Sequence, residues 1–339
     1  MHGWLVIDKP VGPGSTDIVS KVKRALREGG YPKAKVGHGG TLDPLASGVL
    51  PVALGEATKL AGRMLDADKV YHFTIRFGEQ TDTLDGEGAV VATSDVRPML
   101  AAVEAVLPSF TGEIDQIPPI YSALKVDGQR AYTLARAGAE VEMKTRAVTI
   151  HVLSVRADPT SVCADPPSAR VERSRDTLSK GAEEGRFSTS LEASGSPFPA
   201  LNEITLTARV SKGTYIRSLA RDIALALGTV GHVTMLRRLK AGPFTLEGAI
   251  SLDTLGEYAN ARTLEQALLP LTAGLDDIPA LPVTPDQAGA LRQGREVIGI
   301  AAKPGLHLAT DGSVPVALVE LSEGELRVVR GFNIQTQGV

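Results

Sequence analysis

The sequence holds a single cysteine, Cys163, among 339 residues. One thiol can form neither an internal disulfide nor a zinc site built from several thiolates. The six histidines are also too scattered to match the short spacings of common metal sites. We therefore expect a protein of reducing surroundings that holds no metal.

Long apolar runs are also absent. No run of about 18 apolar residues occurs, so the sequence offers no candidate for a membrane-spanning helix. The first ten residues, MHGWLVIDKP, place an acid and a proline where a secretory signal needs an apolar stretch. Apolar residues still make up 43% of the chain, which suffices for a core in about two domains. These features predict a globular cytoplasmic protein with no membrane partner.

Excess charge of either sign is lacking, because the formal net charge is only −3. Such a balance disfavours a protein that coats nucleic acid without specificity. The charges are unevenly distributed, however: residues 209–240 hold seven lysines and arginines against one acid, whereas residues 241–339 hold six against twelve. The basic segment 209–240 is therefore a candidate for contact with phosphate groups.

The spacing of apolar residues predicts several elements. Residues 15–30 combine a cap-type start, helical spacing and a Gly-Gly stop, which predict a helix. Residues 71–78, YHFTIRFG, alternate like a half-buried strand opened by the tyrosine. Residues 204–228 change from strand alternation to helical spacing after a turn. Tyr215 and Arg217 fall where this helix begins, a position that favours an anion.

The order of these elements predicts the fold class. Strands and helices mix without a steady βαβ period, which is typical of an α+β fold. Residues 157–203 are rich in Ser, Pro, Ala and charge, and this composition predicts a flexible insertion. Short strand-like runs separated by turns predict a small β-rich domain at residues 278–339. It follows a larger domain at residues 1–275.

Asp43 is the first candidate for chemistry, within GHGGTLDPLASGVL at residues 37–50. The glycines permit tight turns and Pro44 fixes φ, so the carboxylate is held on a bend. An aspartate there is more often a turn former than a catalyst, and a histidine among glycines, such as His38, can simply cap backbone groups. A phosphate-loop interpretation is weak, because the Gly-Lys-Ser/Thr ending and the full dinucleotide fingerprint are both missing.

Six stretches, in order, resemble the TruB-type tRNA pseudouridine synthases. VGHGGTLDPLASGVLPVALGEATKL is similar to the family's catalytic-aspartate motif over its whole length. The others are WLVIDKPVGPGSTDIVSKVKR, DKVYHFTIRFGEQTDTLDGEG, QIPPIYSALKVDGQRAYTLARAG, SKGTYIRSLARDIALALG and GHVTMLRRLKAGPF, and together the six cover most of residues 4–250. The resemblance implies a catalytic domain with a mixed, mainly antiparallel sheet and, at the C-terminal end, a small PUA-like RNA-binding domain.

The resemblance also implies a reaction, the isomerisation of the uridine at tRNA position 55, in the T-loop, to pseudouridine. The N1–C1′ bond breaks, the trapped uracil turns, and C5 bonds to C1′, so no cofactor is needed. A carboxylate suits this chemistry because it can form a reversible ester-like bond at C1′ or add to the ring. By resemblance Asp43 is this nucleophile. Attack on the sugar, attack on the ring and proton abstraction at C2′ giving a glycal all stay open.

Other residues receive roles by matching the family's motifs. Arg217 matches the partner that keeps the aspartate ionised. Tyr71 matches the tyrosine that stacks on the flipped base and is a candidate to take the C5 proton. The substrate-binding or supporting candidates are Tyr215 and Leu236 as pocket walls, His38 for extruding the target or holding the loop, Asp85 near the pocket, Lys9 with Pro10 beneath the active site, and Lys212 for RNA contact.

The sequence departs from the family beside Lys9, with Pro13-Gly14 where relatives usually show a bulky residue followed by Ser or Thr. A second departure is the segment 157–203, which is longer than the common form and contains Cys163. Neither change touches the match of the catalytic aspartate.

The expected partner is tRNA, bound through its T-arm and T-loop by a monomeric enzyme. A base inside a folded T-loop must leave its stack before a carboxylate reaches it, which favours recognition of RNA shape and base flipping. A guide-RNA-dependent synthase subunit is disfavoured because long basic tails are lacking. A non-catalytic tRNA-binding folding factor is disfavoured because Asp43, Tyr71 and Arg217 are intact.

Overall fold

One large mixed sheet forms the body of the protein in a computed structural model that describes residues 1–126, 128–139, 141–156 and 200–334. Its strands are β1 Gly3–Lys9, β2 Val36–His38, β3 Ala46–Leu54, β4 Lys69–Phe77, β7 Gly112–Gln116, β10 Arg146–Val155, β11 Glu203–Val210, β12 Gly231–Ala241 and β13 Phe244–Thr245. The order is β1-β3-β12-β4-β11-β10-β7, with β2 on β3 and β13 on β12. Within the described part of this sheet, β3 and β12 pair in parallel and the other pairs are antiparallel. The predicted mixed, mainly antiparallel sheet is confirmed.

Three helices cover one face of this sheet: α1 Ser15–Glu28, α5 Ile216–Ala226 and α6 Leu252–Ala261. Their apolar stripes share one core with strand residues such as Leu5, Ile7 and Phe73. Each fully buried side chain of this kind contributes about 1.5–3 kcal/mol to the free energy of unfolding. The helix expected at residues 15–30 is confirmed, because helical spacing places its apolar positions on the sheet.

The opposite face of β1 belongs to a second core. Because side chains alternate along a strand, Trp4 and Val6 point away from the helix-covered face. They pack with the short segments that follow β3, namely a 3₁₀ helix Gly55–Leu60 and α2 Ala61–Asp66. The remaining short elements are α3 Leu100–Val106, α4 Ala131–Arg136, the 3₁₀ helices Leu107–Phe110, Leu264–Ala267 and Leu271–Gly274, and the hairpins of β5 Glu79–Thr81 with β6 Val90–Thr93 and β8 Lys125–Val126 with β9 Gln129–Arg130.

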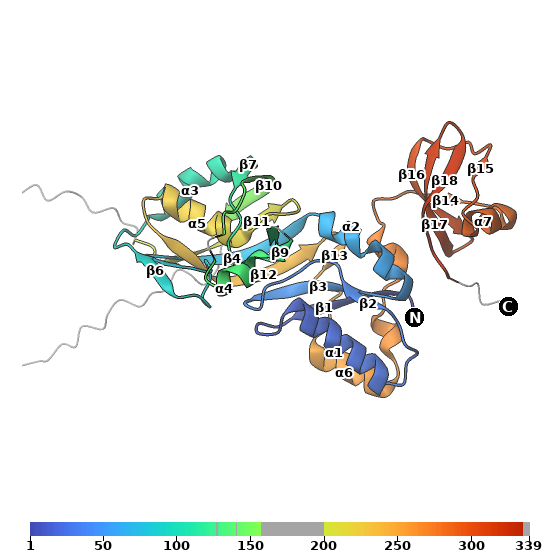
Figure 1. The fold of residues 1–339 in the computed structure, drawn as a ribbon, viewed down its shortest axis with the longest axis horizontal. Helices are drawn as coiled ribbons and strands as arrows, with labels where there is room; N and C mark the ends of the chain where they lie inside the picture. Colours follow the sequence, from blue (N-terminus) through green and yellow to red (C-terminus); the bar gives the residue numbers. More distant parts are fainter. Residues whose placement is uncertain (127, 140, 157–199, 335–339) are drawn as a thin grey trace, which may run out of the picture.

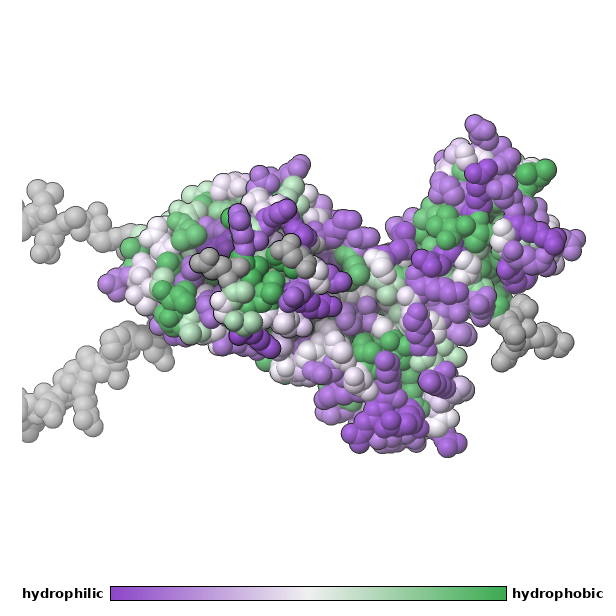
Figure 2. Space-filling model, viewed as in Figure 1, coloured by the Kyte–Doolittle hydropathy of each residue, from purple (hydrophilic) through white to green (hydrophobic). Residues whose placement is uncertain are grey.

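The C-terminal end forms a separate five-stranded sheet. Its strands are β14 Ala280–Pro282, β15 Val297–Ile298, β16 Gly305–Asp311, β17 Val314–Ser322 and β18 Glu325–Gly331, and α7 Pro285–Arg292 packs on them. Figure 1 shows this sheet standing beside the body, and Figure 2 shows the surface hollowed between the two. The expected β-rich character of this end is confirmed.

Two predicted boundaries, the start of the strand at Tyr71 and the end of the insertion at residue 203, differ in the structure. Tyr71 is the third residue of β4 and not the first, because Lys69 and Val70 already pair with β11. The predicted insertion at 157–203 extends too far toward the C-terminus. Leu201 already donates a backbone hydrogen bond to Pro98, and β11 begins at Glu203. Residues 157–199 lie outside the described residues. In the described part, no helix combines the length and apolarity needed to cross a membrane.

Candidate active site

Asp43 lies on the loop between β2 and β3, and hydrogen bonds from several elements fix this loop. Ala46 donates its backbone N–H to the carbonyl of Asp43 at 3.1 Å, which closes a tight turn. The hydroxyl of Ser15, at the start of α1, accepts from the backbone N–H of Leu42 at 2.7 Å. The buried guanidinium of Arg238 donates to the carbonyls of Gly40 and Thr41, each at 3.2 Å. Asp43 is therefore held on a bend, as its sequence predicts, and its carboxylate is presented from a rigid loop.

Lys9 supports this loop from below. Its side chain is fully buried at the end of β1, and Nζ donates to the backbone carbonyls of Pro10, Pro44 and Ala46. Burial lowers the pKa of Lys9 to about 8, although the charge of Asp43 acts in the opposite direction. The position is consistent with the supporting role implied by the motif. At the departure beside it, Gly14 serves as the residue before α1 and donates its N–H to Asp17.

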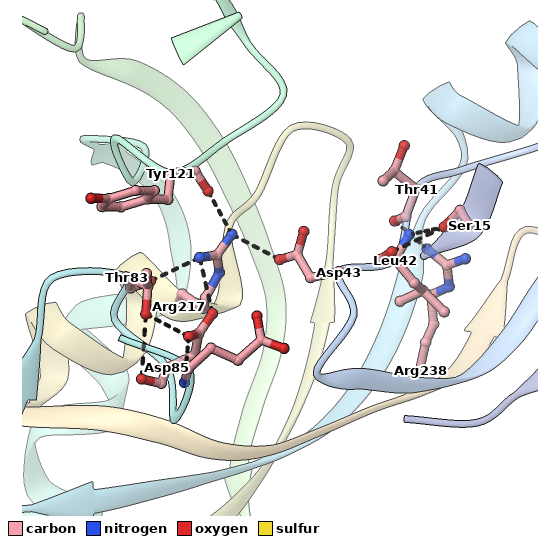
Figure 3. Close-up of polar contacts among 10 residues, drawn as sticks. Ser15, Thr41, Leu42, Asp43, Thr83, Asp85, Tyr121, Arg217 and Arg238 are labelled. Atoms are coloured by element: carbon pink, nitrogen blue, oxygen red, sulfur yellow. Dashed lines mark hydrogen bonds and ion pairs between the residues drawn. The ribbon is translucent and has the colours of Figure 1, made fainter. Parts of the chain in front are cut away.

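Arg217 forms an ion pair with Asp43, with 2.8 Å between Nη2 and Oδ2. The helix start at α5 delivers this arginine, since Tyr215 is its N-cap and Ile216 its first residue. The Arg217 side chain is only 7% exposed, whereas that of Asp43 is 41% exposed. Figure 3 shows Arg217 lying between Asp43 and Asp85. The aspartate thus combines a fixed positive partner with an open approach.

A second carboxylate anchors the same arginine from the protein side. Nη1 of Arg217 lies 3.1 Å from Oδ2 of Asp85 and donates to the carbonyl of Thr83 at 2.8 Å. Nη2 also donates to the carbonyl of Tyr121 at 3.0 Å (Figure 3). Asp85 is itself buried and accepts from the hydroxyl of Thr83 and the backbone N–H of Glu87. Asp85 therefore lies behind Arg217 and not in contact with the pocket.

One pocket of about 480 Å³ brings five of the predicted residues together. Its wall includes Asp43, Tyr71, Tyr215, Arg217 and Leu236, which come from separate stretches of the chain. The sheet explains this convergence. Strand β4 lies between β11 and β12, and Leu236 of β12 pairs with Ala46, where β3 begins after the loop that carries Asp43. Burial raises the pKa of Tyr215, so this phenol is neutral at pH 7.

Four other predicted residues do not line this pocket. Lys9 and Asp85 lie behind it, as described above. His38 ends β2 and accepts a long hydrogen bond at 3.4 Å from the backbone N–H of Gly40. Burial and the charge of Arg238 lower the pKa of His38, so its imidazole is neutral at pH 7. Lys212 lies on the exposed turn after β11, in an ion pair with Asp66 at 3.0 Å.

Most cations of the basic segment 209–240 are buried or ion-paired in the fold, so the segment presents less free positive charge than its count along the chain suggests. Arg217 and Arg238 are buried and bonded inside the protein. Arg209 pairs with Asp68 at 2.9 Å and Arg237 with Asp8 at 2.8 Å. Tertiary pairing with acids from distant segments neutralises most of the local excess, which a count along the chain does not reveal.

Sequence reasoning missed two residues of the site. Gln116, at the end of β7, accepts the backbone N–H of Tyr215 at 2.8 Å and so fixes the start of α5. Lys69, at the start of β4, lines the pocket with its side chain almost fully buried. The signal for Lys69 was its place two residues before Tyr71, on the same face of the strand. In the described ranges, no group of three His, Cys, Asp or Glu side chains is placed to hold a metal ion.

Comparison with known proteins decides the family. Residues 27–177 match the model of the TruB family pseudouridylate synthase (N terminal domain), and residues 217–276 match that of the tRNA pseudouridylate synthase B C-terminal domain. The chain is 58% identical over 335 residues to a tRNA pseudouridine synthase B of Novosphingobium aromaticivorans, with 99% of this chain and 98% of the relative covered. This chain belongs to the TruB family. The resemblance seen in the sequence is thereby confirmed.

Other relatives extend the comparison. A tRNA pseudouridine synthase B of Zymomonas mobilis is 55% identical, with 98% of this TruB family chain and 96% of the relative covered. A chain from the crystal structure of a Cbf5-Nop10-Gar1 complex superimposes with a TM-score of 0.64 at 26% identity, covering 97% of this chain and 84% of that one. A chain from an H/ACA RNP bound to a substrate RNA containing 2′-deoxyuridine gives 0.63 at 24% identity, covering 97% and 84%, and shows the shared fold.

Proposed function

We propose that this TruB family member is a tRNA pseudouridine synthase that isomerises the uridine at tRNA position 55, with Asp43 as the nucleophile. The observation that carries the proposal is the pairing of a half-exposed Asp43 with a buried Arg217 on the wall of one pocket. The names of relatives that are 55–58% identical over nearly the whole chain support tRNA as the substrate. The chains from the H/ACA RNP and from the Cbf5-Nop10-Gar1 complex are more distant, at 24–26% identity, which favours the stand-alone enzyme.

The geometry accounts for how Asp43 acts. Arg217 contacts one carboxylate oxygen and favours the charged form, while the exposed side of Asp43 faces the pocket. In the sugar-attack route, the carboxylate bonds to C1′ as the N1–C1′ bond breaks and its electron pair goes to the uracil. The uracil then turns, C5 bonds to C1′, and the carboxylate leaves. Loss of the C5 proton and protonation of N1 complete the isomerisation without a net redox change.

Tyr71 and Leu236 supply the surfaces that hold the turning base. Tyr71 lies on β4 and Leu236 on the adjacent strand β12, and both line the pocket. An aromatic ring offers a stacking face to a base that has left the T-loop. We propose that Tyr71 stacks on the flipped uracil and takes the C5 proton, while Leu236 and Tyr215 wall the pocket.

The wider assignment follows from the same proposal. Residues 1–275 form the catalytic domain, and residues 278–339 form a PUA-like domain that contacts the tRNA acceptor arm. His38 and Lys212 contact the refolded T-loop and the T-arm. The enzyme works as a cytoplasmic monomer and needs no added metal or cofactor. A folding factor for tRNA without catalysis is the second candidate, since the same surfaces serve binding alone.

Tritium release from a tRNA transcript labelled at uridine C5 tests the proposal. The purified wild-type protein, without added metal or cofactor, should release tritium from position 55 only. Asp43→Asn should lower the rate by roughly 10³-fold or more, because the amide is not a nucleophile. Its affinity for tRNA should change little.

The exposed Asp95→Asn is the matched control and should behave like the wild type. Normal turnover by Asp43→Asn would overturn the assignment of the nucleophile. Binding without tritium release by the wild type would leave the folding factor as the function.

A further inference from the structure

Lys69 is a pocket residue that the reaction described above does not use. It opens β4 two positions before Tyr71, and both side chains line the pocket. The residue is only 7% exposed. Its Nζ donates to the backbone carbonyl of Leu65, in the last turn of α2, at 2.6 Å. A lysine is seldom buried unless it has a partner for its charge.

The hydrogen bonds of Lys69 differ from those of the other buried cations. Arg217 donates to Thr83, Asp85 and Tyr121 besides pairing with Asp43, and Lys9 donates to three carbonyls. Within the described residues, Leu65 is the one hydrogen-bond acceptor of Lys69, and no carboxylate lies within ion-pair distance of it. An ammonium group has three N–H donors. Two donors of Lys69 are therefore available for a ligand.

Charged groups from neighbouring elements surround Lys69 where it lines the pocket. The charged groups that act on it are Arg238 from β12, Asp66 and Asp68 from the end of α2 and the turn after it, and Lys212 from the turn after β11. Asp66 and Asp68 already pair with Lys212 and Arg209. The acids nearest Lys69 are thus engaged with other cations, and Lys69 lines the pocket without an ion-pair partner among the described residues.

We propose that Lys69 binds a backbone phosphate of the RNA beside the flipped nucleotide. This inference rests on the proposed function, because it takes RNA as the substrate. In such a substrate the phosphodiester oxygens carry the full negative charge, and a lysine binds them as a compact point charge. The phosphate provides the direct ion-pair partner that no carboxylate of the described residues provides. Lys69 then anchors the nucleotide while Asp43 and Tyr71 hold its sugar and base.

Variants at Lys69 separate this role from a structural one. Lys69→Met keeps the apolar stem and removes the charge, and Lys69→Arg keeps the charge. If the phosphate is bound, Lys69→Met should weaken tRNA binding roughly tenfold and reduce the slope of log affinity against log salt by about one. The rate at saturating tRNA should change less than threefold, and Lys69→Arg should recover most of the affinity.

The pH dependence supplies an independent readout. Burial lowers the pKa of free Lys69 to about 8, and an anion binds only the protonated form. Wild-type affinity should therefore fall as the pH rises through 8. Lys69→Arg should lack this loss, because arginine stays charged. Lys9, with a pKa also about 8, is present in both proteins and so serves as an internal control.

Replacing a backbone phosphate of the RNA with an uncharged methylphosphonate tests whether that phosphate is the ligand of Lys69. T-arm RNA with methylphosphonates on both sides of the target nucleotide should bind wild type about tenfold more weakly, and Lys69→Met should show no further loss. Lys21→Met, on the exposed face of α1, is the matched control and should match wild type. An equal methylphosphonate effect in wild type and Lys69→Met would overturn the proposal, as would a loss of thermal stability in Lys69→Met without a change in salt slope.

Binding is measured in the Asp43→Asn background, where turnover is too slow to consume the tRNA during the measurement. If Lys69→Met loses affinity as expected but the wild-type protein releases no tritium, the proposed function is contradicted and the phosphate contact stands. If the wild type releases tritium but Lys69→Met binds tRNA normally, the phosphate contact is contradicted and the proposed function stands.

Discussion

At the scale of single residues, Arg217 connects two carboxylates that have different surroundings. Asp85 is buried, whereas Asp43 is half-exposed. Removing one partner of a buried ion pair leaves an uncompensated charge and usually costs about 3–5 kcal/mol. Asp85 therefore acts through Arg217: it fixes the guanidinium so that the remaining Nη2 donor points at Asp43 (Figure 3).

This arrangement predicts that a change at Arg217 lowers the rate of the chemical step much more than it lowers the affinity for tRNA. Arg217→Lys should lower the single-turnover rate about 100-fold, since one ammonium cannot reproduce the planar contacts to Asp43, Asp85 and two carbonyls. The affinity for tRNA should change less than threefold. Single-turnover tritium release and filter binding at two salt concentrations measure the two quantities. A loss confined to affinity and recovered at low salt would show that Arg217 is a phosphate contact instead.

At the scale of elements, the parallel contact between β3 and β12 positions the site. Gly48 of β3 pairs with Arg238 of β12 and has a φ of +102°. A Cβ at Gly48 would lie 2.1 Å from the carbonyl oxygen of Arg238, a distance that no structure tolerates. Glycine is thus required there both by its backbone conformation and by the close approach. The contact holds Arg238 beside the loop that carries Asp43.

Gly48→Ala should separate these strands and displace the loop. We expect a loss of at least about 2 kcal/mol in the free energy of unfolding, together with a large loss of turnover. Gly37→Ala on β2 is the control, because an added Cβ meets nothing within 4 Å there. Denaturant unfolding and tritium release measure both effects. Wild-type stability in Gly48→Ala would show that β3 and β12 can shift apart freely.

At the scale of the whole molecule, the C-terminal sheet is attached to the body by an apolar contact. Leu308, Leu318 and Phe332 join the core that contains Trp4. Two hydrogen bonds flank this contact: Lys59 donates to the carbonyl of Gly331, and the backbone N–H of Asn333 donates to Glu56. The two parts of the chain therefore have a defined relative position.

Truncation of the central aromatic side chain tests this attachment. Phe332→Ala should lower the free energy of unfolding by about 3–5 kcal/mol, because Phe332 is only 2% exposed. Turnover at saturating tRNA should be retained, and the tRNA concentration needed should rise. Val329→Ala, at a position that is 56% exposed, is the control. Calorimetry and steady-state kinetics give the two results, and an unchanged unfolding transition would contradict the tight contact.

Much of this protein follows from the sequence by itself. Helical spacing in residues 15–28 and strand alternation from Tyr71 depend on local periodicity, so both elements were predicted. The bend at Asp43 follows from glycines and a proline that restrict the backbone locally. Motif resemblance gave the correct family and named five residues that line the pocket, because such stretches retain their order along the chain.

Only the tertiary structure decided how charges are paired and which of them are buried. The basic segment 209–240 loses most of its excess to acids such as Asp8 and Asp68, which are far away in sequence. Asp85 lies behind Arg217, and this position does not follow from local spacing. Burial and ion pairing depend on which distant segments meet in space, and the order of strands in the sheet sets these meetings. A periodic pattern along the chain shows which face of an element is apolar. It does not show which charged residues the fold places opposite one another.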